Sequence, residues 1–529
     1  MNMKYLLVLL LLSTTFVYGQ QYAKGRVYCD LNGNGKYDRG EKLLAGVGVT
    51  NGSDVVLTNE KGQYTLPISG EATIAVIKPA QYRTAFDKYN KPCNYYYYKP
   101  EGTPSREGYK GIAPTGKLPS SIDFALVPQE ESATFTALLM GDPQPHFEDH
   151  ISYFSKAIVS ELEGIKGVSF GISLGDVNDE NFDLFDPYSR EISKIGVPWY
   201  NVMGNHDMDF EAKTDEESDD AFETFIGPAN YAFNYGNAHF LILDNVLFPN
   251  PRSAASPKSY WGGFRADQKR FIENNLKLVD KNKLVVVAFH IPLLGENAIR
   301  KEDKAFLFEC LKEFPHVLLL SAHLHTQNQY LHTQEDGWQG SAPLHEYNAG
   351  ATCGDFYSGY LDEAGVPQSL MADGTPKGYA FLRVNGNKYS IDYQASGKPA
   401  DYRMSVNIPR QVVKDRYTPA FITVNFFMGS AKDKVEYRID SGEWKTMKKE
   451  EVTDPDHDYL VQRWNRDEAV KYARWPAASV PASHIWRVRV PSALPMGKHT
   501  VEVRVSDMFG NTHFGKGEYE IVEPVRMYP

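Results

Sequence analysis

Aspartate, asparagine and histidine recur in this chain directly after short apolar runs. Asp142 and Gln144 follow one such run, and Asp176 follows the next. The arrangement returns further along the chain at Asn205-His206-Asp207, Asp244-Asn245, His290 and His323-Leu324-His325. Oxygen and imidazole ligands without thiolates suit divalent ions such as Mn, Fe or Zn. Two such ions about 3.5–4 Å apart can clamp a phosphate ester, so the pattern predicts a binuclear metal centre.

The elements around these residues explain how they could meet. Between about residues 131 and 395, apolar strand-like runs alternate with helical patterns such as 149–162 and 266–279. This alternation predicts a layered α/β domain. Ligand sites in such domains lie beyond the carboxyl ends of the strands, so we expect these loops to converge on one crevice.

Five ordered motifs in this segment resemble those of the calcineurin-like metallophosphoesterase superfamily. The family pattern is D-x-H, GDxxD, GNH[D/E], a lone His and GHxH, and the matching stretches here are Asp142-Pro143-Gln144, 175–179, 204–207, His290 and 322–325. The first motif has glutamine where most members have histidine, and the last has Ala322 where glycine is usual. The flanking segments resemble those of a bacterial subgroup with β modules on both sides of the catalytic core.

The resemblance implies a role for each residue of these motifs. One ion would be held by Asp142, Gln144, Asp176 and His325. The other would be held by Asp176, Asn205, His290 and His323, with Asp176 bridging the two. His206 would protonate the leaving oxygen or stabilise phosphoryl charge, and Asp207 would orient its ring. The implied reaction is direct attack of a metal-bridging hydroxide on a phosphate ester, with monoesters favoured slightly over diesters.

Two β-rich segments flank the predicted catalytic domain, which we place at residues 128–395. Residues 20–127 consist of short strand patterns broken by Gly and Asn turns, and they predict an N-terminal β-sandwich. Residues 396–529 return to strand patterns and predict an Ig-like β-sandwich. We therefore expect a multidomain protein with an α/β core between two β domains.

The N-terminal β segment contains a second metal motif of twelve residues. Oxygen side chains occupy positions 1, 3, 5, 9 and 12, with Gly35 at the sharp turn, and they are Asp30, Asn32, Asn34, Asp38 and Glu41. Strands rather than helices are expected on either side, so the loop resembles those of extracellular Cna-B or SdrD-B-type modules. It either binds a structural calcium ion or forms an Asx-rich turn that needs none.

The start of the chain predicts export. Lys4 precedes an apolar run over residues 5–12, and small residues follow up to Gly19. This pattern is typical of a secretory signal peptide over residues 1–19, so we expect a secreted or periplasmic protein. The run is too short for a membrane span, and no later stretch predicts one. Cys29 and Cys93 could form a disulfide bond, or the four cysteines could be free thiols.

Composition narrows the function classes. The chain has 529 residues, a formal net charge of −11 and 42% hydrophobic residues, which is typical of a globular multidomain protein. A disordered chain and a disulfide-dense miniprotein are excluded, and no basic stripe predicts binding to a nucleic-acid duplex.

The leading hypothesis is an exported metal-dependent phosphoric ester hydrolase acting on a phosphorylated small molecule, glycan or other phosphoester. The alternative is a binding or adhesion protein built on a degenerate phosphoesterase fold. Because nearly all ligand positions carry the usual residue, the hydrolase is favoured. The β modules either frame the active site or bind glycans.

Overall fold

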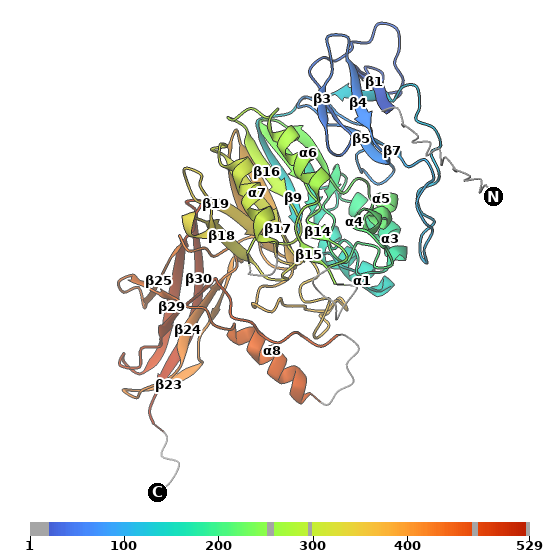
Figure 1. Ribbon diagram of the computed structural model, residues 1–529. Coiled ribbons are helices and arrows are strands. Elements are labelled where there is room, and N and C mark those ends of the chain that lie inside the picture. Colours follow the sequence, from blue (N-terminus) through green and yellow to red (C-terminus); the bar gives the residue numbers. More distant parts are fainter. Residues whose placement is uncertain (1–20, 251–258, 295–298, 468–473, 525–529) are drawn as a thin grey trace, which may run out of the picture.

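The computed structural model describes residues 21–250, 259–294, 299–467 and 474–524 (Figure 1). The predicted signal peptide, residues 1–19, lies outside the described residues. The chain forms an N-terminal β domain, a central α/β domain and a C-terminal β domain, which follow one another from blue to red in Figure 1. The multidomain fold class predicted from the sequence is therefore confirmed.

Two four-stranded sheets form the N-terminal domain. One contains β4 (Gln63–Ile68), β1 (Gln21–Cys29), β8 (Phe124–Pro128) and β6 (Tyr82–Arg83). The other contains β3 (Val55–Leu57), β2 (Gly48–Thr50), β5 (Ala72–Val76) and β7 (Tyr95–Tyr98). Residues from both sheets, such as Val27, Val49 and Ile74, pack into one buried cluster, which is the expected core of a β-sandwich.

Two larger sheets form the centre of the protein. The first has the order β11 (Trp199–Asn201), β10 (Phe170–Ser173), β9 (Thr134–Met140), β20 (Gly378–Asn385) and β21 (Lys388–Ala395). The second has the order β12 (Tyr231–Tyr235), β13 (Ala238–Ile242), β16 (Leu284–Ala288), β17 (Val317–Ser321), β19 (Leu344–Asn348) and β18 (Asn328–His332). A short pair, β14 (Val246–Leu247) and β15 (Trp261–Gly262), lies outside both.

Helices cover the outer face of each central sheet. The first sheet packs against α1 (Glu148–Phe154), α2 (Ser160–Leu162) and α3 (Phe185–Ser193), with a π-helical turn (Ser155–Val159) between α1 and α2. The second packs against α6 (Ala266–Leu276) and α7 (Lys301–Leu311), which lie over β16 and β17 in Figure 1. The remaining short helical pieces are α4 (Asp215–Ser218), α5 (Asp220–Phe225) and the 3₁₀ turns Phe182–Leu184 and Gln334–Asp336.

Strand β16 illustrates the four layers of the central domain, which are two packed sheets with helices on the outer face of each. Its alternate residues face opposite sides: Val286 joins the cluster between the two sheets, whereas Val285 and Val287 join the cluster beneath α6 and α7. All five residues of β16 are buried. A continuous apolar run of this kind is expected for a parallel strand covered on both faces.

The C-terminal domain is a β-sandwich with one added helix. Its first sheet contains β22 (Met404–Asn407), β24 (Phe421–Phe426), β28 (Ile485–Arg489) and β27 (Lys448–Lys449). Its second contains β23 (Gln411–Val413), β30 (Thr512–Val522), β29 (Gly497–Ser506), β25 (Lys434–Ile439) and β26 (Lys445–Thr446). Helix α8 (Pro455–Arg466) was not among the expected elements of this domain; Asp454 caps its start, and a proline occupies its first turn.

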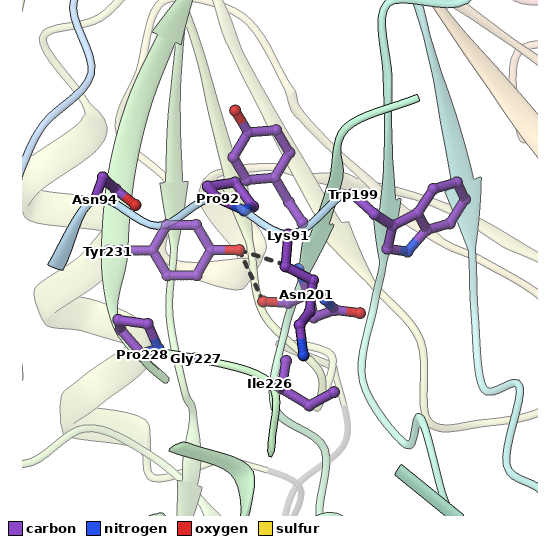
Figure 2. A pocket seen from close by; sticks show the side chains of 10 residues that line it. Lys91, Pro92, Asn94, Trp199, Asn201, Ile226, Gly227, Pro228 and Tyr231 are labelled. Atoms are coloured by element: carbon purple, nitrogen blue, oxygen red, sulfur yellow. Dashed lines mark hydrogen bonds between the residues drawn. The ribbon is translucent and has the colours of Figure 1, made fainter. Parts of the chain in front are cut away.

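The N-terminal domain contacts the central domain through buried charged side chains, and a small cavity lies at their interface. On the N-terminal side, the Lys99 ammonium lies 2.5 Å from Asp220 and 2.7 Å from Glu223. A cavity of about 30 Å³ lies at the same interface, and Figure 2 shows Pro92 and Asn94 facing Tyr231 there. The Tyr231 hydroxyl bonds to the backbone of Asn201. This cavity has room for only one or two water molecules and contains none of the predicted metal ligands.

Two further expectations can be compared with the structure. All four cysteines are free thiols, so the Cys29–Cys93 bridge left open by the sequence is not formed. Among the described helices, none is both long and apolar enough to cross a membrane.

Candidate metal centre

The predicted ligands follow the carboxyl ends of parallel strands in both central sheets. Asp142 comes after β9, Asp176 after β10 and Asn205 after β11 in the first sheet. In the second sheet, His290 comes after β16, and His323 and His325 come after β17. The fold thus brings residues separated by more than 180 positions to one place.

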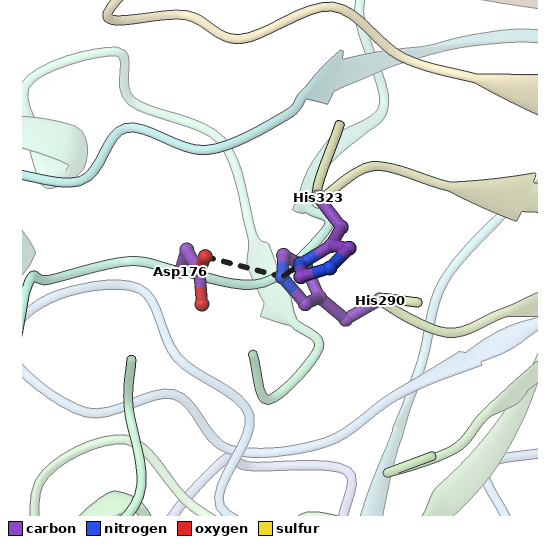
Figure 3. Close-up of side chains that lie close together, drawn as sticks. All are labelled: Asp176, His290 and His323. Atoms are coloured by element: carbon purple, nitrogen blue, oxygen red, sulfur yellow. Dashed lines mark hydrogen bonds and ion pairs between the residues drawn. The ribbon is translucent and has the colours of Figure 1, made fainter. Parts of the chain in front are cut away.

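His290 lies at the centre of one ligand group (Figure 3). Its Nε2 atom is 3.1 Å from an Asp176 carboxylate oxygen, 3.1 Å from Asn205 Oδ1 and 3.3 Å from His323 Nδ1. The other ring nitrogen, Nδ1, lies 2.8 Å from the Leu174 carbonyl oxygen. A carbonyl accepts the proton on Nδ1, which leaves the Nε2 lone pair available for a metal ion. These four side chains are the predicted ligands of the second ion.

The remaining predicted ligands are Asp142, Gln144 and His325. Asp142 Oδ1 is 3.6 Å from His325 Nε2, and its second carboxylate oxygen accepts the backbone N–H of His323. His325 Nδ1 lies 3.1 Å from the Gly354 carbonyl oxygen, so its Nε2 atom is also free. The Gln144 amide nitrogen donates to Asp179, 3.3 Å away, which leaves Oε1 for a ligand. The structure therefore brings together all seven predicted metal ligands.

Unpartnered buried atoms show that the donor set fits metal ions. Asp142 Oδ1 and Gln144 Oε1 are buried and have no hydrogen-bond partner. Burying a polar oxygen without a partner costs about 1–3 kcal/mol, which a coordinated cation would offset. Carboxylate, amide and imidazole donors together suit Mn, Fe or Zn.

The backbone at the site is unusual. Five of the seven predicted ligands have positive φ angles, a conformation that is uncommon for residues other than glycine: Asp142 (39°), Gln144 (40°), Asp176 (48°), His323 (74°) and His325 (51°). Such strain concentrates at functional sites, where the surrounding structure holds it in place.

Two glycines of the motifs, Gly175 and Gly204, are required because neighbouring atoms leave no room for a Cβ atom. The third position, where Ala322 replaces the usual glycine, has no such requirement. A Cβ atom on Gly175 would lie 2.3 Å from the His290 ring, and one on Gly204 would lie 2.1 Å from the Asp176 backbone nitrogen. Ala322, by contrast, has no positive φ, and its methyl group is buried in the core. The usual glycine of the last motif is therefore not required by this backbone.

The charges of the site depend on one another. Burial raises the pKa of Asp142 to about 8, and the neighbouring Asp176 adds to this effect. Burial alone would lower the pKa of His290, but Asp176 and Asp142 outweigh it and raise the value to about 9. Burial lowers the pKa of His323 to about 3 and that of His325 to about 4, so both rings are neutral ligands at pH 7. A divalent cation would take the place of the protons that Asp142 and His290 otherwise retain.

His206 has different partners from those predicted. Its Nδ1 atom lies 3.1 Å from Asp179 and 3.1 Å from Glu180. The Asp207 carboxylate, which was expected to orient this ring, instead accepts N–H groups of Gly204 and Asn178. This corrects the predicted role of Asp207: it is fully buried beneath the loop and shapes the backbone that carries Asn205 and His206.

The carboxylates around His206 keep it protonated. Burial lowers the pKa of this ring, but Glu180, Asp176 and Asp179 together raise it to about 9. At neutral pH the ring therefore carries a proton that it can donate. The group of Asp179, Glu180 and His206 also has the spacing of a metal site.

Two further residues shape the site, although the sequence pattern assigned neither of them a role. Asp179 holds both the Gln144 amide and the His206 ring, and it is the last residue of the GDxxD motif, which could have indicated its role. Asn245 accepts the backbone N–H groups of His290 and Ile291, and its amide donates to the Ile291 carbonyl. It thereby fixes the turn that presents His290, and its place after β13 was the available signal.

The predicted calcium loop is closed by its own hydrogen bonds. The Asp30 carboxylate accepts the backbone N–H groups of Gly33 and Gly35 at 2.7 and 2.8 Å. The amides of Asn32 and Asn34 both donate to Asp38 at 2.8 Å. These bonds are typical of an Asx-rich turn, and calcium binding here stays a prediction.

Comparisons with known proteins agree with this geometry. The family model for calcineurin-like phosphoesterase matches residues 135–327, that for the N terminal of calcineurin-like phosphoesterase matches 31–111, and that for its C terminal matches 346–513. The chain therefore belongs to the calcineurin-like phosphoesterases, in the subgroup with extension domains on both sides. The expected family and subgroup are confirmed, and with them a metal-dependent phosphoesterase fold.

The chain is also weakly similar to several solved structures. A purple acid phosphatase from yellow lupin (Lupinus luteus) is 12% identical, with 67% of this chain and 75% of that chain covered and a TM-score of 0.38. Vps29 from Chaetomium thermophilum is 10% identical, with 73% and 98% covered and a TM-score of 0.22. No curated protein matches the chain.

Proposed function

We propose that the protein is an exported, binuclear metal-dependent phosphoesterase that hydrolyses phosphate monoesters in preference to diesters. The observation that carries the proposal is the convergence of seven ligand side chains, two of which keep buried oxygen atoms without a partner. Two divalent ions at this site would supply electrostatic stabilisation of the phosphoryl oxygens and an acidified water.

The protein's own residues perform the remaining tasks. An Asp176 carboxylate oxygen lies 3.1 Å from His290 Nε2, and the Asp176 carbonyl accepts the backbone N–H of Gln144 at 2.9 Å, so Asp176 would be the ligand shared by the two ions. His206, protonated at neutral pH, can donate a proton to the leaving oxygen. Asp179 orients both His206 and the Gln144 amide, which links the proton donor to the first ion's ligands.

The test is an activity assay on the mature chain reconstituted with Mn. p-Nitrophenyl phosphate and bis-p-nitrophenyl phosphate are compared for the wild type and for Asp176→Asn, whose fold is checked by circular dichroism. His345→Gln is the matched control, because His345 is a buried histidine of the second central sheet whose ring binds Gln329 and Tyr389. We expect turnover of the monoester that is lost in Asp176→Asn and kept in His345→Gln.

The other outcomes distinguish the alternatives. Faster turnover of the diester would refute the monoester preference and leave the phosphoesterase. An absence of both turnover and bound metal would support the alternative, a binding or adhesion protein with a degenerate site. For export, we propose cleavage after Gly19, and N-terminal sequencing of protein recovered outside the cytoplasm should then start at Gln20.

A further inference from the structure

A groove of about 490 Å³ opens beside the candidate metal centre, and its lining includes Phe147, His150, Tyr153, Asp179, Tyr357 and Arg474. Asp179 joins the groove to the reaction centre, because its carboxylate contacts both Gln144 Nε2 and His206 Nδ1. A leaving group whose oxygen lies beside His206 would therefore extend along this wall. The volume is within the range of small-molecule sites, about 300–1,000 Å³.

Rings form much of the groove surface. The His150 ring lies 4.6 Å from the Tyr357 ring at 37° and 6.0 Å from the Tyr153 ring at 29°. The Phe147 ring, 5.4 Å from His150, is 60% exposed. His150 is uncharged at neutral pH, since burial and the neighbouring His146 lower its pKa to about 4. The groove therefore offers flat, largely uncharged faces on which another ring can stack.

The C-terminal domain adds a cation to this wall. The Arg474 guanidinium lies 4.2 Å from the centre of the Phe356 ring, and Phe356 in turn stacks on His325 at 4.2 Å and 28°. The backbone is tied down as well, because the Arg474 carbonyl accepts the N–H of Gly359. A planar guanidinium placed in this way can stack on a ring and donate hydrogen bonds to its edge.

The loop that carries the rings is strained. Phe356 and Tyr357 are consecutive residues with φ angles of 51° and 55°, a conformation that aromatic residues rarely adopt. The Tyr357 hydroxyl donates to the Pro143 carbonyl at 2.5 Å, next to Gln144. Strain of this kind persists where the surroundings enforce it and is concentrated at ligand sites. The loop is therefore held so that Phe356 stacks on a predicted metal ligand and Tyr357 faces the groove.

We propose that this groove binds the leaving group of the phosphate ester and that this group carries an aromatic ring, as in an aryl or nucleoside phosphate. Phe147 and His150 would provide the stacking faces, with the buried Tyr357 ring packed against His150, and Arg474 would bring the C-terminal domain into the substrate site. The inference rests on the proposed phosphoesterase function and extends it to a class of substrate.

The test compares substrates that differ in the leaving group. The Mn-loaded full chain is assayed with phenyl phosphate and adenosine monophosphate, with glycerol phosphate, which has no ring, and with glucose 6-phosphate, whose ring is saturated. The groove variants are Phe147→Ala and Arg474→Gln. Their controls are Leu278→Ala, an exposed leucine after α6, and Arg463→Gln, whose guanidinium stacks on Tyr360 at 4.5 Å.

Stacking on an aromatic side chain contributes enough that its removal should lower kcat/KM for the two aromatic substrates by at least about fivefold. The same variants should leave kcat/KM for glycerol phosphate nearly unchanged, and the controls should change neither. Equal effects on all four substrates, or no effect on any, would overturn the inference while the phosphoesterase function stands. A response confined to glucose 6-phosphate would overturn the aromatic class.

A binding measurement keeps the groove testable if no substrate is turned over. Isothermal titration with adenosine and with phenylphosphonate should show binding that Phe147→Ala weakens, and the groove assignment would then stand although the proposed function had failed. An absence of binding by the wild type would overturn the groove assignment.

Discussion

The C-terminal domain contacts the loop that follows β17, which carries His323 and His325, through buried polar groups. A single substitution can measure how much these contacts stabilise the loop. Asp373 accepts the backbone N–H of Gln327 at 2.7 Å and lies 3.1 Å from His484 Nε2. The other ring nitrogen of His484 lies 2.7 Å from Asn425 Oδ1. All four residues are at most 1% exposed. Gln327 follows His325 by two positions, so the network supports a predicted ligand.

The expected effect of His484→Ala is large. Both ring nitrogens of His484 face oxygen atoms, Asn425 Oδ1 at 2.7 Å and an Asp373 carboxylate oxygen at 3.1 Å. Removing a hydrogen-bond partner of the buried Asp373 carboxylate costs about 1.5–3 kcal/mol, the range for hydrogen bonds to charged groups. Every 1.4 kcal/mol is about a factor of ten. The backbone amides of Gln327 and Thr375, which both donate to Asp373, should therefore exchange about 10–10²-fold faster.

Hydrogen–deuterium exchange with mass spectrometry measures this directly on the full chain. The matched control is His513→Ala, because His513 lies 2.8 Å from Asp507 within the C-terminal domain and has no part in the interface network. We expect the control to leave peptides around Gln327 and Thr375 unchanged. Similar exchange of these peptides in His484→Ala and the wild type would refute the view that the C-terminal domain supports the metal-binding loop.

Three further predictions concern the metal centre and the core. Mn at about one hundred times its Kd should stabilise the protein by about 2.7 kcal/mol, and thermal unfolding with and without chelator should show that Asp176→Asn abolishes this gain. Asp179→Ala should weaken Mn binding by about 10–100-fold in calorimetry, because it frees the Gln144 amide; unchanged affinity would contradict this. Burial lowers the pKa of His239 to about 4 and that of His345 to about 3. Below pH 6.5 these two histidines take up protons in the unfolded chain but stay neutral in the folded protein. The free energy of unfolding should therefore fall by about 1.4 kcal/mol per pH unit for each ring. Replacing both histidines with glutamine should flatten the dependence of melting temperature on pH between 6.5 and 5. An unchanged slope would show that these two rings do not cause the pH dependence.

Much of the fold and the metal centre could be predicted from the sequence because the signals are local. A fully apolar run such as 284–288 predicts a strand covered on both faces, and the polar residue that follows it predicts a ligand at its carboxyl end. The order of the motifs then identified the family. Helix α8 was not predicted because it lies between segments with strand patterns, which favour a β-sandwich throughout. Asp454-Pro455 is nevertheless a recognisable helix start.

The partner of each polar side chain could not be predicted in the same way. Asp179 and Asp207 both lie within a few residues of a ligand in sequence, yet only Asp179 reaches the His206 ring. The groove depends on even more distant contacts, since Arg474 meets Phe356 across a domain boundary. By itself, the sequence determined the strands, the order of the ligands and the chemistry of their donor atoms, because these follow from residue type and periodicity along the chain. Only the tertiary structure decided which carboxylate holds the proton donor and which domain completes the groove, because hydrogen bonds and ring contacts depend on distances of a few ångströms between residues that the sequence leaves far apart.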